Sequence, residues 1–242
     1  MTAIVTGASR GIGKACALGL ARAGYDVAVN YVSNEEAANR VVEEIKALGR
    51  NAVAVKADTA DSKAVKDMFR TVNTELGGID VLVNNAGIVD DRYLLMLTEE
   101  SLTRSLSVNI QGYFNCAQQA ALKMMRKKAG CIVNISSVSS VVAIAGQSVY
   151  SATKGAVNSM TATLAKELAQ FGIRVNAVAP GFIETEMMDH IPEEKKEEYL
   201  KAIPLGKFGS AEDVANLVVE LCSEKMRYVT GQTIILDGGL SL

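Results

Sequence analysis

Short apolar runs alternate along the chain with longer stretches in which apolar residues recur every three or four positions. The short runs are continuously apolar, which is typical of parallel strands buried on both faces. The amphipathic stretches between them predict helices that make the right-handed crossovers of such a sheet. Seven strands are predicted, at residues 2–6, 27–31, 52–57, 79–84, 131–136, 174–179 and 233–236. The expected fold is α/β, a doubly wound Rossmann sheet in a single domain, residues 1–242.

The predicted helices span residues 14–23, 34–48, 61–76, 99–128, 149–171 and 211–223. Four glycines stand where a helix is expected to end: Gly49, Gly77, Gly130 and Gly172. Residues 181–206 interrupt the alternation, with a charged run between Pro192 and Pro204. The run itself is typical of a solvated helix face, but the apolar residues around it predict a lid over a pocket. They are Phe182, Ile183, Met187, Met188, Ile191 and Ile203.

The composition of the chain argues against several classes of binding partner. The net charge of -2 offers no basic field for nucleic acid or an anionic membrane. No apolar run is long enough to span a bilayer and no signal peptide fits before Thr2, so a soluble, cytoplasmic protein is expected. The only histidine, His190, has no cysteine or second histidine near it, so neither a metal site nor a Ser-His-Asp triad is expected. Four widely spaced cysteines predict buried, reduced thiols: Cys16, Cys116, Cys131 and Cys222.

A glycine-rich stretch connects the first strand to the first helix. Its glycines allow a tight turn and a close approach of the backbone to a ligand. A pyrophosphate can then bind the free N–H groups at the positive end of the helix. The spacing G-x-x-x-G-x-G differs from the common G-x-G-x-x-G, and a simple tight connection is the alternative interpretation. The stretch opens the first βαβ unit, which favours a phosphate site made by Gly7, Ala8, Ser9, Arg10, Gly11, Ile12 and Gly13.

Tyr150 and Lys154 lie one helical turn apart on the same face of the fifth helix. Alone, such a pair is equally typical of a surface contact. However, a strand ends in a cluster of hydroxyl residues at 136–139, shortly before Tyr150. Other polar segments reach the same edge of the sheet, although each also has a purely structural interpretation as a turn or a packing amide. They are the segment 84–87, Asn109 in the long helix, and Pro180-Gly181.

In order along the whole chain, these motifs resemble the short-chain dehydrogenase/reductase family. The matching motifs are TGASRGIG, NNAG, the helical Asn109, Ser137, Y-x-x-x-K and the Pro-Gly turn. A narrower resemblance, to bacterial 3-oxoacyl-acyl-carrier-protein reductases, rests on Asn84–Gly87, Ala179–Thr185, Ile203–Leu205 and the C-terminal residues 229–239. The resemblance implies a Rossmann fold, an NAD(P)-dependent carbonyl reduction and a homotetramer joined through the long helices and C-terminal strands.

The resemblance also assigns roles at the site. It implies that Tyr150 is the acid/base, that Ser137 binds the substrate carbonyl, that Lys154 holds the nicotinamide ribose, and that Asn109 anchors a water leading to solvent. Physical chemistry favours the Tyr150–Lys154 pair, because an ammonium should lower the pKa of a phenol from its usual value of about 10. The further residues expected at the cofactor are Asn30, Asp58, Thr59, Asn85, Ala86, Gly87, Pro180, Gly181, Ile183 and Thr185, together with Tyr150 and Lys154.

NADPH is the expected cofactor. The second strand ends in Val29-Asn30-Tyr31, without the acidic residue that NAD-selective sheets use for the ribose 2′-hydroxyl. Arg10 is placed to pair with a 2′-phosphate, its alternative role being that of a solvated surface arginine.

The expected reaction is reduction of a 3-oxoacyl thioester, carried on acyl carrier protein, in fatty-acid-type synthesis. The alternatives are a reductase of another ketone, such as a polyketide, sterol or other small carbonyl, and a non-catalytic NADP-binding sensor. Arg126, Lys127 and Lys128 form a basic cluster expected beside the entrance, where it could steer an acidic carrier, or they are only a favourable helix C-terminus. The chain departs from the narrower group at Lys128, Phe171, Asp90 and Asp91, which leaves room for a specialised substrate.

Overall fold

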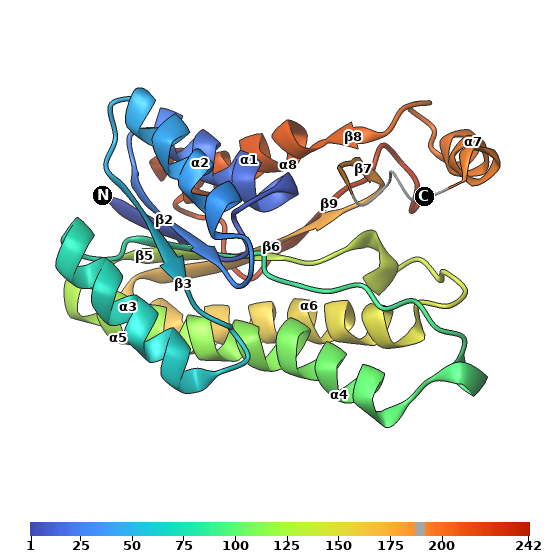
Figure 1. Ribbon diagram of the computed structural model, residues 1–242, viewed down its shortest axis with the longest axis horizontal. Coiled ribbons are helices and arrows are strands. Elements are labelled where there is room, and N and C mark those ends of the chain that lie inside the picture. The colour runs from blue at the N-terminus through green and yellow to red at the C-terminus, as the bar shows by residue number, and fades with distance from the viewer. Residues whose placement is uncertain (187–191) are drawn as a thin grey trace.

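A seven-stranded parallel sheet forms the centre of the protein, in a computed structural model that describes residues 1–186 and 192–242 (Figure 1). The strand order is β3-β2-β1-β4-β5-β6-β9. The strands are β1 (Thr2–Val5), β2 (Asp26–Tyr31), β3 (Ala52–Lys56), β4 (Val81–Asn84), β5 (Gly130–Ile135), β6 (Ile173–Pro180) and β9 (Thr233–Leu236). The predicted doubly wound sheet is therefore confirmed. Its order reverses between β1 and β4, which is where such sheets bind ligands, outside the carboxyl ends of the strands.

Helices cover both faces of the sheet (Figure 1). On one face lie α1 (Gly11–Arg22), α2 (Glu35–Ala47) and α8 (Ala211–Cys222). On the other lie α3 (Ser62–Leu76), α4 (Glu99–Leu106), α5 (Gly112–Lys127) and α6 (Ser148–Leu168). Each layer buries its own apolar cluster against the sheet, so alternate strand residues such as Ala3 and Ile4 face opposite clusters. All four cysteines are buried with free thiols, as expected.

The helix predicted over residues 99–128 is interrupted. A π-helical turn, Ser107–Gln111, separates α4 from α5. The helix also ends differently from the prediction, because Lys128 adopts the left-handed conformation (φ 52°) at its C-terminus. Gly130 opens β5 instead, where a Cβ would come within 2.5 Å of the Met124 sulfur. The prediction for Gly130 was wrong, while Gly49, Gly77 and Gly172 do adopt positive φ at or just after the ends of their helices.

The insertion after β6 extends further than residues 181–206. A two-stranded pair, β7 (Ile183–Glu184) and β8 (Gly209–Ser210), encloses α7 (Glu193–Ala202). The Phe182 ring stacks on Tyr199, with centroids 4.2 Å apart. Met187, Met188, His190 and Ile191 lie outside the described residues. Short 3-10 turns complete the chain: η1 (Leu94–Met96), η3 (Val138–Ser140), η4 (Ala169–Phe171) and η6 (Glu224–Met226).

A buried row of polar side chains joins the middle of the sheet to α6. The Asn84 amide donates to Asn134 Oδ1 at 3.0 Å, and the Asn134 amide donates to Thr161 Oγ1 at 2.9 Å. All three residues are buried, and Thr161 in turn donates to the Val157 carbonyl at 2.8 Å. Because buried polar groups cost free energy unless they are paired, this row fixes α6 in one position relative to β4 and β5.

Removing the central amide should therefore destabilise the protein. We expect Asn134→Ala to lower the free energy of unfolding by about 2–3 kcal/mol. The variant removes the donor to Thr161 and one of the two acceptors of the Asn84 amide, which keeps only the Tyr113 carbonyl at 3.3 Å. Urea denaturation measures the change. The control is Asn73→Ala on the exposed face of α3, expected to change stability by less than about 0.5 kcal/mol. Similar losses in the two variants would contradict the role of the row.

Candidate active site

The loop between β1 and α1 has the shape of a phosphate cradle. Gly7 (φ 61°) and Gly11 (φ 54°) adopt left-handed conformations that favour glycine. Gly13 is needed for space, since a Cβ there would lie 2.4 Å from the Gly7 carbonyl oxygen and 2.5 Å from Asn85 Nδ2. Arg10, the residue before α1, makes no side-chain cap, and the first turn of the helix has no acidic residue. The start of α1 therefore suits a pyrophosphate group.

The segment after β4 holds this loop on one side. Thr6 Oγ1 accepts hydrogen bonds from the backbone N–H groups of Asn85 (2.9 Å) and Ala86 (3.0 Å). The Asn85 amide donates to the carbonyls of Thr6 (2.9 Å) and Gly7 (3.2 Å). The NNAG motif is thus bonded directly to the glycine loop, as expected for two parts of one site.

Asn30 holds the loop on the other side. Its Oδ1 accepts from the Gly7 N–H at 3.2 Å, and its amide donates to the carbonyls of Val55 (3.2 Å) and Ala57 (2.9 Å). The side chain is buried beneath the loop. Asn30 therefore shapes the cradle, and the direct contact with a cofactor predicted for it stays a prediction.

The other residues expected at the cofactor lie along the carboxyl edge of the sheet. Asp58 is exposed, and Thr59 is buried against Gly112 of α5. Gly181 packs against Asp237, where a Cβ would lie 2.7 Å from the aspartate Cβ. Thr185 comes close to the glycine loop, since a Cβ on Gly11 would lie 3.8 Å from its methyl group. Pro180 ends β6 and Ile183, which is buried, begins β7, while Ser9 and Ile12 are half-buried in the loop.

The structure brings Ser137, Tyr150 and Lys154 together. Ser137 follows β5 and precedes the turn η3, where its hydroxyl accepts from the Ser139 N–H at 3.2 Å. Tyr150 lies in the first turn of α6, and its side chain lies close enough to Ser137 for the serine to lower its pKa. The hydroxyls of Ser137 and Tyr150 therefore lie where one substrate carbonyl oxygen could accept from both.

Lys154 is buried one turn further along α6, only 3% exposed. Its ammonium donates to the Ile135 carbonyl at 2.7 Å and to the Tyr113 hydroxyl at 3.2 Å. The Nζ atom lies 5.6 Å from the centre of the Tyr150 ring. Burial lowers the pKa of Lys154 to about 7, because it disfavours the charged form.

The pKa of Tyr150 differs from the expectation. Burial raises it to about 12, the hydrogen bond with Ser137 opposes this rise, and the charge of Asp91 adds to it. The expected lowering by Lys154 was wrong for this structure. The ammonium lies over the Tyr150 ring and donates to other oxygens, so its effect does not outweigh the desolvation of the phenolate. Tyr150 is consequently a neutral phenol at pH 7, the form that can donate a proton.

Asn109 lies in the π-helical turn and is fully buried. Its Oδ1 accepts from the Ile88 N–H at 2.8 Å, and its amide donates to the Ile88 carbonyl at 2.9 Å and to Thr153 at 3.3 Å. The side chain therefore positions the segment after Gly87 beside α6. The water contact predicted for Asn109 stays a prediction.

Tyr113, whose hydroxyl accepts a hydrogen bond from Lys154, was not among the predicted site residues. Its place four residues after Asn109 in the predicted helix was the one available signal, but the π-helical turn that sets the direction of its side chain was not predicted. The basic cluster Arg126–Lys128 also lies elsewhere than predicted. Lys127 pairs at 2.9 Å with Asp80, which immediately precedes β4, so the cluster at the end of α5 lies at the amino edge of the sheet. Within one chain this edge is opposite to Tyr150, and the prediction beside the entrance was wrong.

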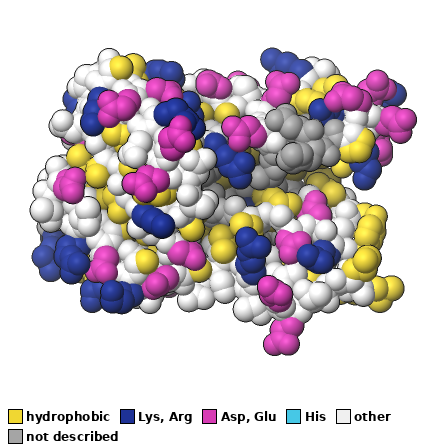
Figure 2. Space-filling model, in the orientation of Figure 1, with side chains coloured by type: hydrophobic (Ala, Val, Ile, Leu, Met, Phe, Trp, Pro, Cys, Tyr) yellow, Lys and Arg dark blue, Asp and Glu magenta, His cyan; other side chains and the backbone are white. Residues whose placement is uncertain are grey.

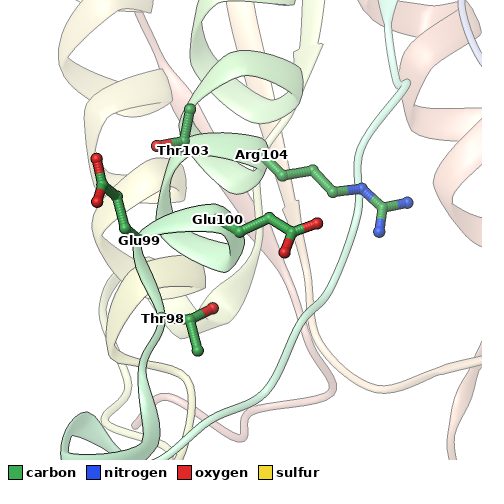
Figure 3. A pocket seen from close by; sticks show the side chains of 5 residues that line it. All are labelled: Thr98, Glu99, Glu100, Thr103 and Arg104. Carbon is green, nitrogen blue, oxygen red and sulfur yellow. The ribbon is translucent and has the colours of Figure 1, made fainter.

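A surface hollow at the start of α4 is separate from these residues (Figure 3). It is lined by Thr98, Glu99, Glu100, Thr103 and Arg104. In residues 1–186 and 192–242 no group of His, Cys, Asp and Glu side chains could hold a metal ion.

Comparison with known proteins identifies the family. The sequence model of the family described as Enoyl-(Acyl carrier protein) reductase matches residues 7–241. The 3-oxoacyl-[acyl-carrier-protein] reductase of Staphylococcus aureus is 49% identical, over 99% of this chain and 97% of its own length. The corresponding protein of Thermotoga maritima is 43% identical, over 98% and 96%.

A short-chain dehydrogenase of Burkholderia cenocepacia, solved in complex with NADP, is similar in structure. It superposes with a TM-score of 0.93 at 38% identity, covering 99% of this chain and 97% of that one. The chain therefore belongs to the short-chain dehydrogenase/reductase family.

Proposed function

We propose that the protein reduces 3-oxoacyl thioesters to 3-hydroxyacyl thioesters with NADPH, acting on substrates carried by acyl carrier protein. The observation that carries this proposal is the grouping of Ser137 and Tyr150 beside the buried ammonium of Lys154, whose Nζ atom lies 5.6 Å from the centre of the Tyr150 ring. This group lies at the carboxyl edge of the sheet, as does the glycine cradle. Curated relatives nearly half identical to the chain are named for this reduction.

Ser137, Tyr150 and Lys154 have different roles in the proposed carbonyl reduction. When bound, NADPH supplies the hydride that adds to the carbonyl carbon. The carbonyl oxygen accepts hydrogen bonds from Ser137 and Tyr150, and it takes the proton of the Tyr150 hydroxyl as its charge develops. The phenolate that remains on Tyr150 is stabilised by the charge of Lys154. One hydride and one proton thus convert the ketone to an alcohol.

An apolar surface near the site suits an acyl chain. The exposed side chains of Tyr93, Leu94, Leu95 and Met96 lie in and beside η1. Apolar side chains gather at that end of the molecule in Figure 2. Two hydrogen bonds tie this segment to the loop before α6, from the Arg92 N–H to the Gly146 carbonyl at 2.8 Å and from Gln147 to Asp91 at 3.0 Å. The apolar segment is therefore held close to the helix that carries Tyr150.

The choice between NADPH and NADH depends on the charged residues near the expected position of the cofactor's adenosine. Strand β2 ends without an acidic residue, and the exposed Arg10 side chain stands at the start of α1. Arg10 Nη1 contacts Glu186 Oε2 at 3.4 Å. A 2′-phosphate would be a stronger partner for Arg10 than this exposed carboxylate, because it carries more charge and more acceptor oxygens. Arg10 therefore selects NADPH over NADH.

The proposed assembly is a homotetramer. Two surfaces suit contacts between copies: an apolar stripe along α4 and α5, and β9, whose outer edge pairs with no strand among the described residues. The stripe includes Leu106, Phe114 and Leu122, which are exposed at helical spacing. Two different two-fold contacts generate a tetramer. An antiparallel pair of α5 helices would also bring the basic end of one copy beside the partner's site, where it could meet an acidic carrier.

No helix of the described residues has the length and apolar content needed to cross a bilayer. We place the proposed reaction in the cytoplasm, where NADPH and carrier-bound acyl groups meet.

The first prediction tests the reaction and Tyr150 together. The protein should oxidise NADPH with a 3-oxoacyl thioester, and Tyr150→Phe should lower kcat by at least about 10²–10⁴-fold while NADPH still binds, because only the transferable proton is lost. Steady-state kinetics and cofactor fluorescence measure the two effects. Tyr228→Phe, at an almost fully exposed tyrosine, is the control. A Tyr150→Phe variant that kept a tenth of wild-type kcat would rule out the assigned role.

The same assay separates the alternatives. Activity on a simple ketone alone would indicate a different carbonyl substrate, and activity on a 2-enoyl thioester alone would indicate reduction of a carbon–carbon double bond. A protein that binds NADPH but turns over none of these would be a sensor.

The second prediction concerns cofactor choice. Arg10→Ala should lower kcat/KM with NADPH about tenfold or more and leave NADH nearly unaffected, since a hydrogen bond to a charged group contributes about 1.5–3 kcal/mol. Kinetics with both cofactors give the ratio. Arg22→Ala, at the far end of α1, is the matched control. Equal losses with both cofactors would refute selection of the 2′-phosphate by Arg10.

The third prediction concerns assembly. The native mass by light scattering should be four times that of the chain, and Phe114→Glu should reduce it by placing a charge in the apolar stripe. Lys66→Glu on the exposed face of α3 should leave the mass unchanged. A monomeric wild-type protein would contradict the proposed tetramer.

A further inference from the structure

Tyr113 lies directly beneath the catalytic lysine. It belongs to α5 and is 1% exposed. Its hydroxyl donates to the Ile135 carbonyl at 2.8 Å and accepts from Lys154 Nζ at 3.2 Å. The same Nζ donates to the Ile135 carbonyl at 2.7 Å. The three polar atoms form a closed triangle at the end of β5.

A packing role alone does not need this hydroxyl. Phenylalanine has nearly the same shape, and burying a hydroxyl costs free energy unless it is hydrogen-bonded. Here the hydroxyl is paired on both sides, as donor to a backbone carbonyl and as acceptor from a buried ammonium. The centre of the Tyr113 ring also lies 5.1 Å from Nζ and that of the Tyr150 ring 5.6 Å, so the cation lies near two aromatic rings.

Asn109 does not share this task through its side chain. Its amide is bonded to Ile88 and Thr153. In the described part of the chain, Tyr113 supplies the only side-chain hydrogen bond that Nζ makes. The orientation of the ammonium therefore depends on one backbone carbonyl and one phenolic hydroxyl.

We propose that Tyr113 is a positioning residue for the proposed reduction: its hydroxyl holds the Lys154 ammonium in place beneath Tyr150 and favours the charged form of the lysine. This inference rests on the proposed function of the Ser137, Tyr150 and Lys154 group. It assigns Tyr113 no contact with substrate or cofactor.

The groups around this triangle determine in which direction the pKa of Lys154 should change when the Tyr113 hydroxyl is removed. Burial, with smaller effects of Tyr150 and Cys116, raises the pKa of Tyr113 well above its usual value, so its hydroxyl stays protonated. Burial lowers the pKa of Lys154 to about 7, and Asp91 acts on Tyr150. Removing the Tyr113 hydroxyl takes an acceptor from the charged lysine and lowers that pKa further. The charged form is then lost at a lower pH as pH rises.

The test is the pH dependence of kcat/KM for Tyr113→Phe. We expect the alkaline limb for reduction of a 3-oxoacyl thioester to move down by about one pH unit, since one unit corresponds to about tenfold in the protonation equilibrium. At pH 8 the loss should therefore approach tenfold, and below pH 6 it should be small. A merely structural role would lower activity equally across pH.

Tyr25→Phe is the matched control. Tyr25 is also buried, and its hydroxyl also donates to a backbone carbonyl, that of Cys222 at 3.5 Å. This variant should keep the wild-type pH profile. If Tyr113→Phe does not fold, Tyr113→Met is the second variant, because it also lacks the hydroxyl and its flexible side chain adapts to the space.

A second readout separates this proposal from the proposed function. The dissociation constant of NADPH, followed by its fluorescence between pH 6 and 9, should rise at lower pH in Tyr113→Phe than in the wild type, since the resemblance places Lys154 at the cofactor ribose. Superimposable profiles of Tyr113→Phe and wild type, in turnover and in binding, would overturn the role of Tyr113. Wild-type protein that binds NADPH but reduces no thioester would overturn the proposed function, and the binding profile would still decide the role of Tyr113.

Discussion

The site depends on how one buried charge is accommodated. Removing an ammonium from water costs several kcal/mol, and such charges are usually paired with a carboxylate. Lys154 instead donates to the Ile135 carbonyl at the end of β5 and to the Tyr113 hydroxyl, with aromatic rings around it. A carboxylate partner would neutralise the charge, whereas carbonyl and hydroxyl dipoles leave it available to stabilise a phenolate. The position of α6, fixed by the buried amide row from Asn84 to Thr161, is what keeps the ammonium at this carbonyl.

The π-helical turn between α4 and α5 also contributes to this site. An extra residue in one turn changes which side chains before and after it face the sheet, and such turns occur often at functional sites. Here the turn contains Asn109, and Tyr113 follows in the first turn of α5. Asn109 faces the segment after β4, while Tyr113 reaches the end of β5. The π-helical turn thus lets one helical segment contact the chain at the ends of two neighbouring strands, β4 and β5.

Most of the sheet and the glycine cradle were predictable because their signals are local. Continuous apolar runs mark strands buried on both faces, and Asn34, Asp61 and Ser210 cap their helices as their residue types suggest. The features that were not predicted depend on contacts between parts of the chain that are far apart in sequence. Lys128 takes a left-handed conformation at a point where its carbonyl packs closely against Gly172 of a distant turn. The π-helical turn, the Tyr113 hydroxyl and the distance of the basic cluster from Tyr150 depend on which helix meets which strand end, and residue spacing does not encode this.

Burial of Tyr150 and Lys154 also determines which direction of the reaction the protonation state of the site suits. It raises the pKa of Tyr150 to about 12 and lowers that of Lys154 to about 7. At neutral pH the tyrosine is almost entirely a phenol, which is the form required to give a proton to a developing alkoxide. The reverse reaction begins with a phenolate, which only a small fraction of the protein carries at this pH. The overall equilibrium is a property of the reactants and is unchanged. The protonation state of the resting site suits the proposed reduction, and desolvation is the largest cause of that state.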